Sequence, residues 1–541
     1  MTRRSKPVVL AVALVAVLCQ SLSPCTSILV SRGASRDGSV MITYSADAPF
    51  LPRFLCMPGG RHQQGATTEV FGWEDFEVKG TIPQAASTHS VVGLMNDHQV
   101  AIGETTTGGR RELVNKEGQL DYDALIFLTL QRAGSAREAI DVIDALAREH
   151  GYSSSGETFS ICDKNEVWMM ELIGKGPGSK GIVWVAARVP DGCIAAHANL
   201  SRITTFPLDD PDHWRYSPDV IEFAKEKGWF DSGAGKPFSF KHAYHPAPDA
   251  AALRACATRV WSIYRRAAPS QQLSDDYHRG DPSAADYPLF IRPDDKLSLH
   301  DVMELMRDHY EGTPYDMTQG IDAGPFQSPY RFRGLTFRVD DNTYTWERPV
   351  ATQQAGFVMV AQCRSFLPDP VGGVYWYTPD DPFTSCFTPF YCGIGSLPEP
   401  YTRGDLNRFS FDSAWWVFNL VSNLAYDRWS RIYPDVSKVQ KETEKSFLEM
   451  QPVIDRIAAE LLEKDPELAR RFLTDYSVQN AQRLFEAWKE LAFFILTKNN
   501  DGFVNDLKGW PKGVGYSESW LREIVKSYPT KYLVSGKEPS D

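Results

Sequence analysis

Short runs of apolar, β-prone residues, paired across turn-forming residues, dominate roughly the first 200 positions of the chain. The runs at 26–31 and 40–44 are joined through Asp37-Gly38, which is a strong hairpin signal. Three further pairs follow the same pattern, at 91–95 with 100–103, 158–162 with 167–172, and 183–189 with 193–198. Because a turn links the two members of each pair, the pattern predicts four successive hairpins and therefore antiparallel sheet.

Helical patterns separate these strands. Ser135 and Glu138 have the spacing of a capping box, and apolar residues recur after them at intervals of three and four. Residues 122–131 are more uniformly apolar, which is typical of a buried helix. Strand pairs that alternate with helices predict sheets covered by helices.

The second half of the chain changes character twice. Residues 206–300 are rich in Pro, Asp and Gly, and predict long loops with short helices near 218–227 and 250–266. Strand signals return over 333–377. From about residue 408 the apolar residues follow a helical period almost to the end, so we expect a C-terminal helical segment.

Composition places the chain among ordinary globular proteins. Hydrophobic residues make up 43% of its 541 positions and charged residues 23%. The formal net charge of −12 argues against a nucleic-acid partner, because binding to phosphates requires a basic surface. We therefore expect no nucleic acid among the partners, and the oligomeric state stays open.

The first residues have the pattern of a secretory signal peptide. Arg3, Arg4 and Lys6 precede an unbroken apolar run over 8–18, and polar or small residues follow. The apolar run is too short to cross a hydrocarbon core of about 30 Å. No other segment is apolar enough for a membrane span, so we predict an exported protein, either periplasmic or extracellular.

Cys25 lies just after this leader. Pro24 is a poor residue before a signal cleavage site, whereas cleavage after Ser21, with Cys19 at the −3 position, fits better. Residues 22–24 would then form a short propeptide that Cys25 could remove by intramolecular attack. A cysteine at a chain start combines a nucleophile with a general base, since an α-amine of pKa about 7.7–8.0 is partly neutral near pH 7.

The same junction has a second interpretation. Leu22-Ser-Pro-Cys25 is similar to a bacterial lipobox, although Pro24 replaces the small residue that such a motif needs. A diacylglyceryl thioether would consume the thiol, so lipidation and nucleophilic chemistry at Cys25 exclude each other. We expect no lipid anchor.

The other cysteines and the histidines lack the spacing of a metal site. The chain has nine cysteines without a CxxC pair, and its histidines form no HExxH motif. We expect His98, His197 and His309 to be structural, and we predict neither a metal nor a cofactor. Cys386 and Cys392 are candidates for a local disulfide, while the pairing of the other cysteines stays open.

A set of short motifs follows in fixed order from Cys25 to the C-terminal helices. They are the runs 25–30 (CTSILV), 33–39 (GASRDGS), 93–104 (GLMNDHQVAIGE), 155–161 (SGETFSI), 166–176 (EVWMMELIGKG), 184–192 (WVAARVPDG), 197–199 (HAN), 308–317 (DHYEGTPYDM) and 365–370 (SFLPDP). In this order they resemble the dipeptidases of peptidase family C69, which are N-terminal nucleophile hydrolases.

The resemblance implies an α+β fold of four layers, an αββα sandwich with Cys25 at the end of a central strand. It implies a leader with a short propeptide over 1–24, a catalytic domain over 25–405 and a helical segment packed on it over 406–541. It also implies dipeptide substrates, which are hydrolysed through a thioester on Cys25.

The resemblance also assigns roles to individual residues. Asp47 matches an aspartate that hydrogen-bonds the amine of the nucleophile. Asn96 and Asn199 match asparagines that contact the oxyanion, a task that suits an uncharged NH₂ donor.

One position departs from the family pattern. Related enzymes often have an arginine three residues before the aspartate, where this chain has Tyr44. A tyrosine can hydrogen-bond a thiolate but cannot hold it by charge, so we expect the amine of Cys25 or another arginine to contribute more. Arg364 is a candidate for that role and for a substrate carboxylate, and Glu104 and Tyr44 are candidates for other substrate contacts.

Two other functions stay open at this point. The same nucleophile would serve an acylase for other linear or cyclic amides, such as penicillins or bile-acid conjugates. A lipid-anchored protein could instead bind peptides without hydrolysing them.

Overall fold

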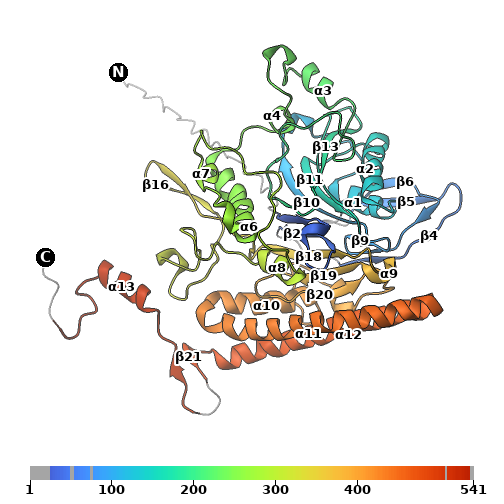
Figure 1. The fold of residues 1–541 in the computed structure, drawn as a ribbon. Helices are drawn as coiled ribbons and strands as arrows, with labels where there is room; N and C mark the ends of the chain where they lie inside the picture. The colour runs from blue at the N-terminus through green and yellow to red at the C-terminus, as the bar shows by residue number, and fades with distance from the viewer. Residues whose placement is uncertain (1–24, 49–53, 73–76, 506–508, 537–541) are drawn as a thin grey trace, which may run out of the picture.

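Two antiparallel sheets form the centre of the structure, a computed structural model that describes residues 25–48, 54–72, 77–505 and 509–536 (Figure 1). The predicted leader, residues 1–24, lies outside the described residues. The smaller sheet has six strands in the order β14 (Ile194–His197), β1 (Ser27–Val30), β2 (Val40–Asp47), β18 (Ala355–Cys363), β19 (Val374–Pro379) and β20 (Thr388–Tyr391). The pairing of β1 with β2 confirms the first predicted hairpin.

The larger sheet has eight strands. Their order is β15 (Trp214–Tyr216), β13 (Ile182–Arg188), β12 (Val167–Gly174), β11 (Gly156–Cys162), β10 (Ala101–Gly108), β9 (Met95–Asn96), β8 (Val91–Val92) and β3 (Cys56–Met57). The hairpin of β11 and β12 confirms the prediction for 158–172. The predicted pair at 91–95 and 100–103 is three strands, since β8 pairs with β9 and β9 pairs with β10.

The fourth predicted hairpin is wrong. β13 and β14 belong to different sheets, and β14 pairs with β1 instead. The chain crosses between the sheets at Pro190-Asp191-Gly192, where the Asp191 carboxylate accepts a hydrogen bond of 2.6 Å from the backbone N–H of Gly33. A short turn between two apolar runs does not reveal whether the second run folds back beside the first or leaves for another sheet.

The two sheets pack face to face. The ring of His197, in the smaller sheet, bonds the hydroxyls of Thr105 and Ser160, in the larger sheet, at 2.7 Å each. A Cβ atom at Gly103 would lie 2.9 Å from the Cβ of Tyr44, so this close approach requires glycine. Every residue of β2 and β18 is buried, as expected for strands that are covered on both faces.

Helices cover the outer faces of both sheets (Figure 1). α1 (Tyr122–Leu130) and α2 (Ala136–His150) pack on the larger sheet, and both match predicted helices. The Ser135 hydroxyl caps α2 by accepting from the N–H of Glu138. On the smaller sheet, α6 (Thr258–Ala267) contacts β14 and α8 (Leu299–Leu305) contacts β18.

The C-terminal helices lie against the other end of the smaller sheet (Figure 1). They are α10 (Ala414–Asp427), α11 (Trp429–Lys464) and α12 (Pro466–Lys498). Two buried ion pairs fix α11 to the rest of the chain: Arg307 with Glu444, and Arg364 with Asp455. The helical pattern predicted from about residue 408 thus corresponds to helices that cover β19 and β20.

Short elements fill the connections. They are β4 (Gly60–Arg61), β5 (Thr67–Phe71), β6 (Val78–Pro83), β7 (Ser87–Thr88), α3 (Val220–Glu226), α4 (Phe240–Tyr244), α5 (Ala250–Ala252), α7 (Asp276–Arg279), β16 (Thr336–Val339), β17 (Asn342–Thr345), α9 (Asp369–Gly372), β21 (Phe503–Val504), β22 (Lys512–Gly513) and α13 (Glu518–Ser527). The antiparallel sheets and separate helices are of the predicted α+β class.

Two further predictions concern single features. No disulfide joins any two of the eight cysteines in the described residues, so the structure has no bridge between Cys386 and Cys392. Among the helices of the described residues, none has both the length and the apolar character needed to cross a membrane.

Candidate active site

Cys25 lies two residues before β1, the second strand of the smaller sheet, and is buried. Its backbone N–H donates to the side-chain Oδ1 of Asn199 at 2.9 Å. Its thiol lies 3.5 Å from Oε1 of Glu104, on β10 of the larger sheet, and donates to it. The residue therefore sits where the two sheets meet, with its nitrogen and its sulfur directed at different partners.

Asn199 follows β14 in the left-handed backbone region, with φ of 61°. Asparagine tolerates this conformation better than most residues, and such strained positions often occur at functional sites. Its Nδ2 donates to the carbonyl of Thr106 at 2.9 Å, while its Oδ1 faces the Cys25 nitrogen. The structure thus brings Asn199 to Cys25 as predicted, but with its acceptor toward the nitrogen and its donor bonded elsewhere.

Arg259, on α6, binds the backbone around Cys25. Its guanidinium donates to the carbonyl of Cys25 at 2.5 Å, to the hydroxyl of Thr26 at 2.8 Å and to Oδ1 of Asn199 at 2.9 Å. Complete burial lowers the pKa of Arg259 to about 10, which still leaves it charged near neutral pH. This arginine holds both the strand start and the asparagine in place.

Asp47 ends β2 and is also buried. Its Oδ2 accepts from Nη2 of Arg348 at 2.5 Å and from the hydroxyl of Ser45 at 3.0 Å. Its Oδ1 has no hydrogen-bond partner among the described residues. Burial raises the pKa of Asp47 above its ordinary value, although Arg348 and Arg259 oppose the shift.

The sulfur of Cys25 has a largely acidic environment. Burial raises the pKa of its thiol well above the ordinary value, and the charges of Glu104 and Asp47 raise it further. The backbone N–H of Asp47 and the charge of Arg348 act in the opposite direction. The thiol form is therefore favoured, so nucleophilic attack from Cys25 needs a base that takes the proton.

Glu104 links Cys25 to two further groups. The Tyr44 hydroxyl donates to its Oε1 at 2.5 Å. Glu157, on the neighbouring strand β11, is fully buried, and burial together with Glu104 raises the pKa of its carboxyl well above the ordinary value. Two carboxyl groups that meet in a buried site favour one shared proton over two negative charges.

Two predicted site residues lie elsewhere. Asn96 donates through Nδ2 to the carbonyls of Leu130 and Ala133 at 2.8 and 2.7 Å. Its Oδ1 accepts from the N–H groups of His98 and Val100 at 3.0 and 2.9 Å. All its amide groups therefore hold the β9–β10 turn against the end of α1, and none is directed at Cys25.

Arg364 is likewise used in packing. Its guanidinium donates to both carboxylate oxygens of Asp455, at 2.5 and 3.1 Å, and to the carbonyls of Val371 and Gly372. These contacts place Arg364 under α11 and away from the group around Cys25.

Arg259, Arg348 and Glu157 are the members of the Cys25 group that the sequence reasoning missed. Arg259 lies in the helix predicted near 250–266, but its complete burial and its contacts with Cys25 are visible only in the structure. Glu157 belongs to the 155–161 motif, directly before the run predicted to form a hairpin with 167–172, but that hairpin does not reveal that its strand also pairs with β10. Nothing local distinguishes Arg348, because its partner Asp47 is 301 positions away.

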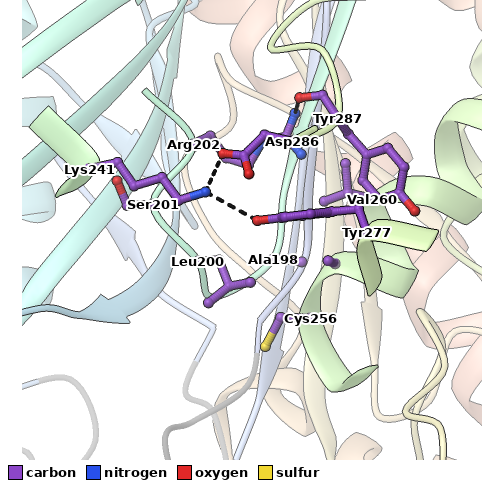
Figure 2. Close-up of a pocket in the computed structure, with 11 residues that line it drawn as sticks. Ala198, Leu200, Ser201, Arg202, Lys241, Cys256, Val260, Tyr277, Asp286 and Tyr287 are labelled. Atoms are coloured by element: carbon purple, nitrogen blue, oxygen red, sulfur yellow. Dashed lines mark hydrogen bonds and ion pairs between the residues drawn. The ribbon is translucent and has the colours of Figure 1, made fainter. Parts of the chain in front are cut away.

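A small pocket is lined by the chain neighbours of Asn199 and Arg259, among them Ala198, Leu200 and Val260 (Figure 2). Ala198 and Leu200 line it from one side and Val260 from another, while Lys241 bonds Asp286 and Tyr277 at its upper edge. The cavity holds only about 10 Å³, enough for one water molecule, and it is too small for a peptide.

The histidines contribute no base to this group. Burial lowers the pKa of His197 to about 3, and its two ring nitrogens bond Thr105 and Ser160, which confirms its structural role. In the described part of the chain, one group of three side chains could hold a metal ion, namely His89, Asp97 and His98, and it is separate from the Cys25 group.

Comparison with known proteins places these residues in a family context. Residues 24–442 match the model of peptidase family C69. A probable dipeptidase of Latilactobacillus sakei is 26% identical over 423 residues, which cover 74% of this chain and 80% of the relative. Dipeptidase A of Lactobacillus helveticus is 25% identical over 462 residues (78% and 88%), and a dipeptidase of Bifidobacterium longum is 24% identical over 458 residues (77% and 80%).

Proposed function

The chain belongs to peptidase family C69 and is a peptide-bond hydrolase, and we propose that it is an exported cysteine dipeptidase whose nucleophile is Cys25. In this proposal the leader is removed and Cys25 becomes the first residue of an N-terminal nucleophile hydrolase. The stacked antiparallel sheets with helices on both outer faces agree with the αββα sandwich of such enzymes.

The observation that carries the proposal is that two residues in contact with Cys25, Asn199 and Asp47, have acceptor side chains. Asn199 already accepts from this nitrogen through Oδ1. Asp47, whose backbone N–H reaches the Cys25 sulfur, keeps the buried oxygen Oδ1 without a hydrogen-bond partner among the described residues. A peptide nitrogen has one hydrogen to donate, whereas an ammonium has three, so these acceptors suit an amine better than an internal amide.

The chemistry then follows from the raised pKa of the thiol. The neutral amine of Cys25 takes the thiol proton, and the sulfur attacks the scissile carbonyl carbon. The resulting ammonium is stabilised by Asp47 and Asn199. It then protonates the departing amine, the C–N bond breaks, and a thioester remains. Water attacks the thioester with the amine again as base, which releases the acid and restores the thiol.

The geometry changes the roles that the sequence assigned. We propose that Asn199 orients the amine rather than the oxyanion, since its donor is bonded to Thr106. Asn96 has no catalytic part in this proposal. The backbone N–H of Asp47, which is directed at the Cys25 sulfur, is a donor for the oxyanion.

Dipeptide substrates are supported by the names of the relatives and by the charge of the site. A dipeptide has a free ammonium group, and Glu104 lies beside the attacking sulfur with Glu157 next to it. We propose that Glu104 contacts this ammonium, with Tyr44 fixing the carboxylate. An N-acyl amide has no such charge, so the same carboxylates argue against an acylase.

The proposal is tested by the mature N-terminus and by substrate choice. Mass spectrometry of the secreted protein should find Cys25 as the first residue with no acyl group. The purified enzyme should hydrolyse free dipeptides at least tenfold faster than the same dipeptides acetylated at the N-terminus. A start at another residue, or a lipid on Cys25, would overturn the mechanism, while a preference for acylated substrates would overturn the substrate class alone.

A further inference from the structure

Three metal-ligand side chains meet at the turn between β9 and β10. Asp97 and His98 belong to this turn, and His89 lies between β7 and β8. One ligand atom from each of the three residues can be chosen so that all of them lie within 4.8 Å of one another. In a tetrahedral site, ligand bonds of about 2.0–2.2 Å place two ligand atoms about 3.4 Å apart, so the three side chains would close around an ion by about an ångström or less through rotation of their side chains.

The carboxylate of Asp97 is incompletely used in the protein. Its Oδ2 accepts from the backbone N–H of Ser90 at 3.1 Å. Its Oδ1 is buried and makes no hydrogen bond within the described residues, and the nearby Nδ1 of His89 is 3.5 Å away. The imidazole of His89 thus faces this oxygen at a distance longer than an ordinary hydrogen bond, and a cation placed between them could bind both groups.

The two imidazoles face the same small space. Their ring centroids are 4.2 Å apart and tilted by 57°, so they are not stacked face to face. The side chains of His89, Asp97 and His98 are 26%, 30% and 47% exposed, so solvent reaches them. Asp97 also lines a cavity of about 300 Å³, which gives a hydrated ion room to approach.

Nearby charged groups define the outer shell of this site. Nδ1 of His98 lies 3.9 Å from Oδ2 of Asp369, while the other oxygen of Asp369 accepts from Lys164 and from Nε2 of Gln99. Because Lys164 already neutralises Asp369, this carboxylate is better suited to orient His98 than to bind a cation. A carboxylate behind a histidine ligand is a recurrent arrangement at metal sites.

We propose that His89, Asp97 and His98 bind one divalent transition-metal ion of the Zn²⁺ type, with water in the fourth position. Two imidazoles and one carboxylate suit zinc better than calcium or magnesium, which prefer oxygen ligands. The ion would tie the segment before β8 to the β9–β10 turn. Its role would be structural, because the Cys25 group is built from other residues.

Metal titration of the full-length protein tests this site. After dialysis against EDTA, isothermal titration with ZnCl₂ should give one saturable site per chain. His98→Ala should weaken binding at least tenfold, and so should Asp97→Asn, whose amide oxygen can still accept from Ser90. The double variant His89→Ala/His98→Ala should abolish the site. Co²⁺ should give visible absorption bands in the parent protein and not in the double variant.

The exposed pair of His213 and Asp210 provides the matched control. Nδ1 of His213 lies 3.0 Å from Oδ1 of Asp210, and the three-ligand group does not include either residue. His213→Ala should bind zinc as the parent does. The proposal is overturned if the parent shows no saturable site, if the double variant binds as tightly as the parent, or if His213→Ala loses the site.

Discussion

Two sets of buried arginine–carboxylate pairs differ in how completely the carboxylates are used. Under α11, Asp455 accepts from Arg364 through both oxygens and from the Tyr391 hydroxyl. Glu444 likewise accepts from Arg307 through both oxygens, at 2.5 and 3.0 Å. Beside Cys25, Asp47 uses one oxygen for Arg348 and Ser45 and leaves the other without a hydrogen-bond partner among the described residues.

The difference separates packing from chemistry. A buried ion pair whose hydrogen bonds are all made has no unused acceptor atom that could bind a substrate or a chain terminus. A buried carboxylate with a free acceptor has a cost in the resting structure that a ligand can relieve. We therefore assign the pairs under α11 to stability and the Asp47 pair to the reaction.

The largest effect is expected at the nucleophile. Cys25→Ala should lower kcat/KM by at least about 10⁴-fold, because both the thioester and the proton transfer from the thiol are lost. The midpoint of thermal unfolding should stay within about 2 °C of the parent, since one buried sulfur makes a small packing contribution. Dipeptide hydrolysis and calorimetry measure the two quantities, and residual activity above 1% of the parent would contradict the assignment.

The pair under α11 should respond in stability and not in turnover. Arg364→Met leaves Asp455 buried without its cation, so the free energy of unfolding should fall by about 3–5 kcal/mol. Activity per folded molecule should stay within twofold of the parent. Urea denaturation and assays with active-site titration measure the two effects.

A partner variant provides the control for this prediction. Arg364→Met/Asp455→Leu removes both charges, and it should recover most of the lost stability. If folded Arg364→Met lost more than tenfold of its activity, the structural assignment would be contradicted and Arg364 would again be a candidate substrate contact.

The Asp47 pair should show the opposite balance. Asp47→Asn keeps the shape and the bond from Ser45 but removes the charge that stabilises the Cys25 ammonium. We expect kcat/KM to fall by about 10²–10³-fold, equivalent to about 2.7–4 kcal/mol. Asp455→Asn, the same substitution in the other set, is the matched control and should leave kcat/KM of the folded enzyme within twofold. Equal activity loss in both variants would remove the distinction between the two sets.

The sequence was most informative where contacts are local. The hairpin of β11 and β12, the cap of α2 and the buried helix α1 were all predicted from short-range patterns. The separation of β13 from β14 was not, because strand partners are chosen by burial across the whole sheet. Cys25 could be identified as the candidate nucleophile because the signal-peptide pattern lies directly before it in the sequence.

The supporting residues could be predicted only in part. Asp47 and Asn199 lie beside Cys25, as the resemblance to the family implied, and so does Glu104, which was a candidate for a substrate contact. Arg259 and Arg348 reach the site from segments more than 200 positions away. The hydrophobic periodicity of the sequence predicts local elements and cannot predict such long-range contacts. Asn96 and Arg364 are of residue types that could contact a substrate or an oxyanion. Their hydrogen bonds, which only the structure shows, are made to other parts of the protein, so both residues have a structural role.

The smallest effect is expected from a carboxylate at the α10 interface. Asp380 accepts from Asn419 and Ser422, and no arginine is among its hydrogen-bond partners in the described structure. Burial, with a further contribution from Asp381, raises the pKa of Asp380 to about 7. The folded protein then holds this proton more tightly than the unfolded chain, so the stabilising contribution of Asp380 is complete at low pH and is lost as pH rises toward 7.

Replacing this carboxylate isolates its contribution. In the parent, ionisation of Asp380 should lower the free energy of unfolding by about 2 kcal/mol between pH 5 and pH 7. The variant Asp380→Asn carries no charge at either pH, so its free energy of unfolding should lack this contribution. The exposed Asp295→Asn should keep the slope of the parent in urea titrations at each pH. An unchanged slope in Asp380→Asn would mean that this buried carboxylate is ionised in the folded protein. A buried carboxylate charge without an arginine would then be tolerated at the helix interface, where both oxygens of Asp380 already accept hydrogen bonds.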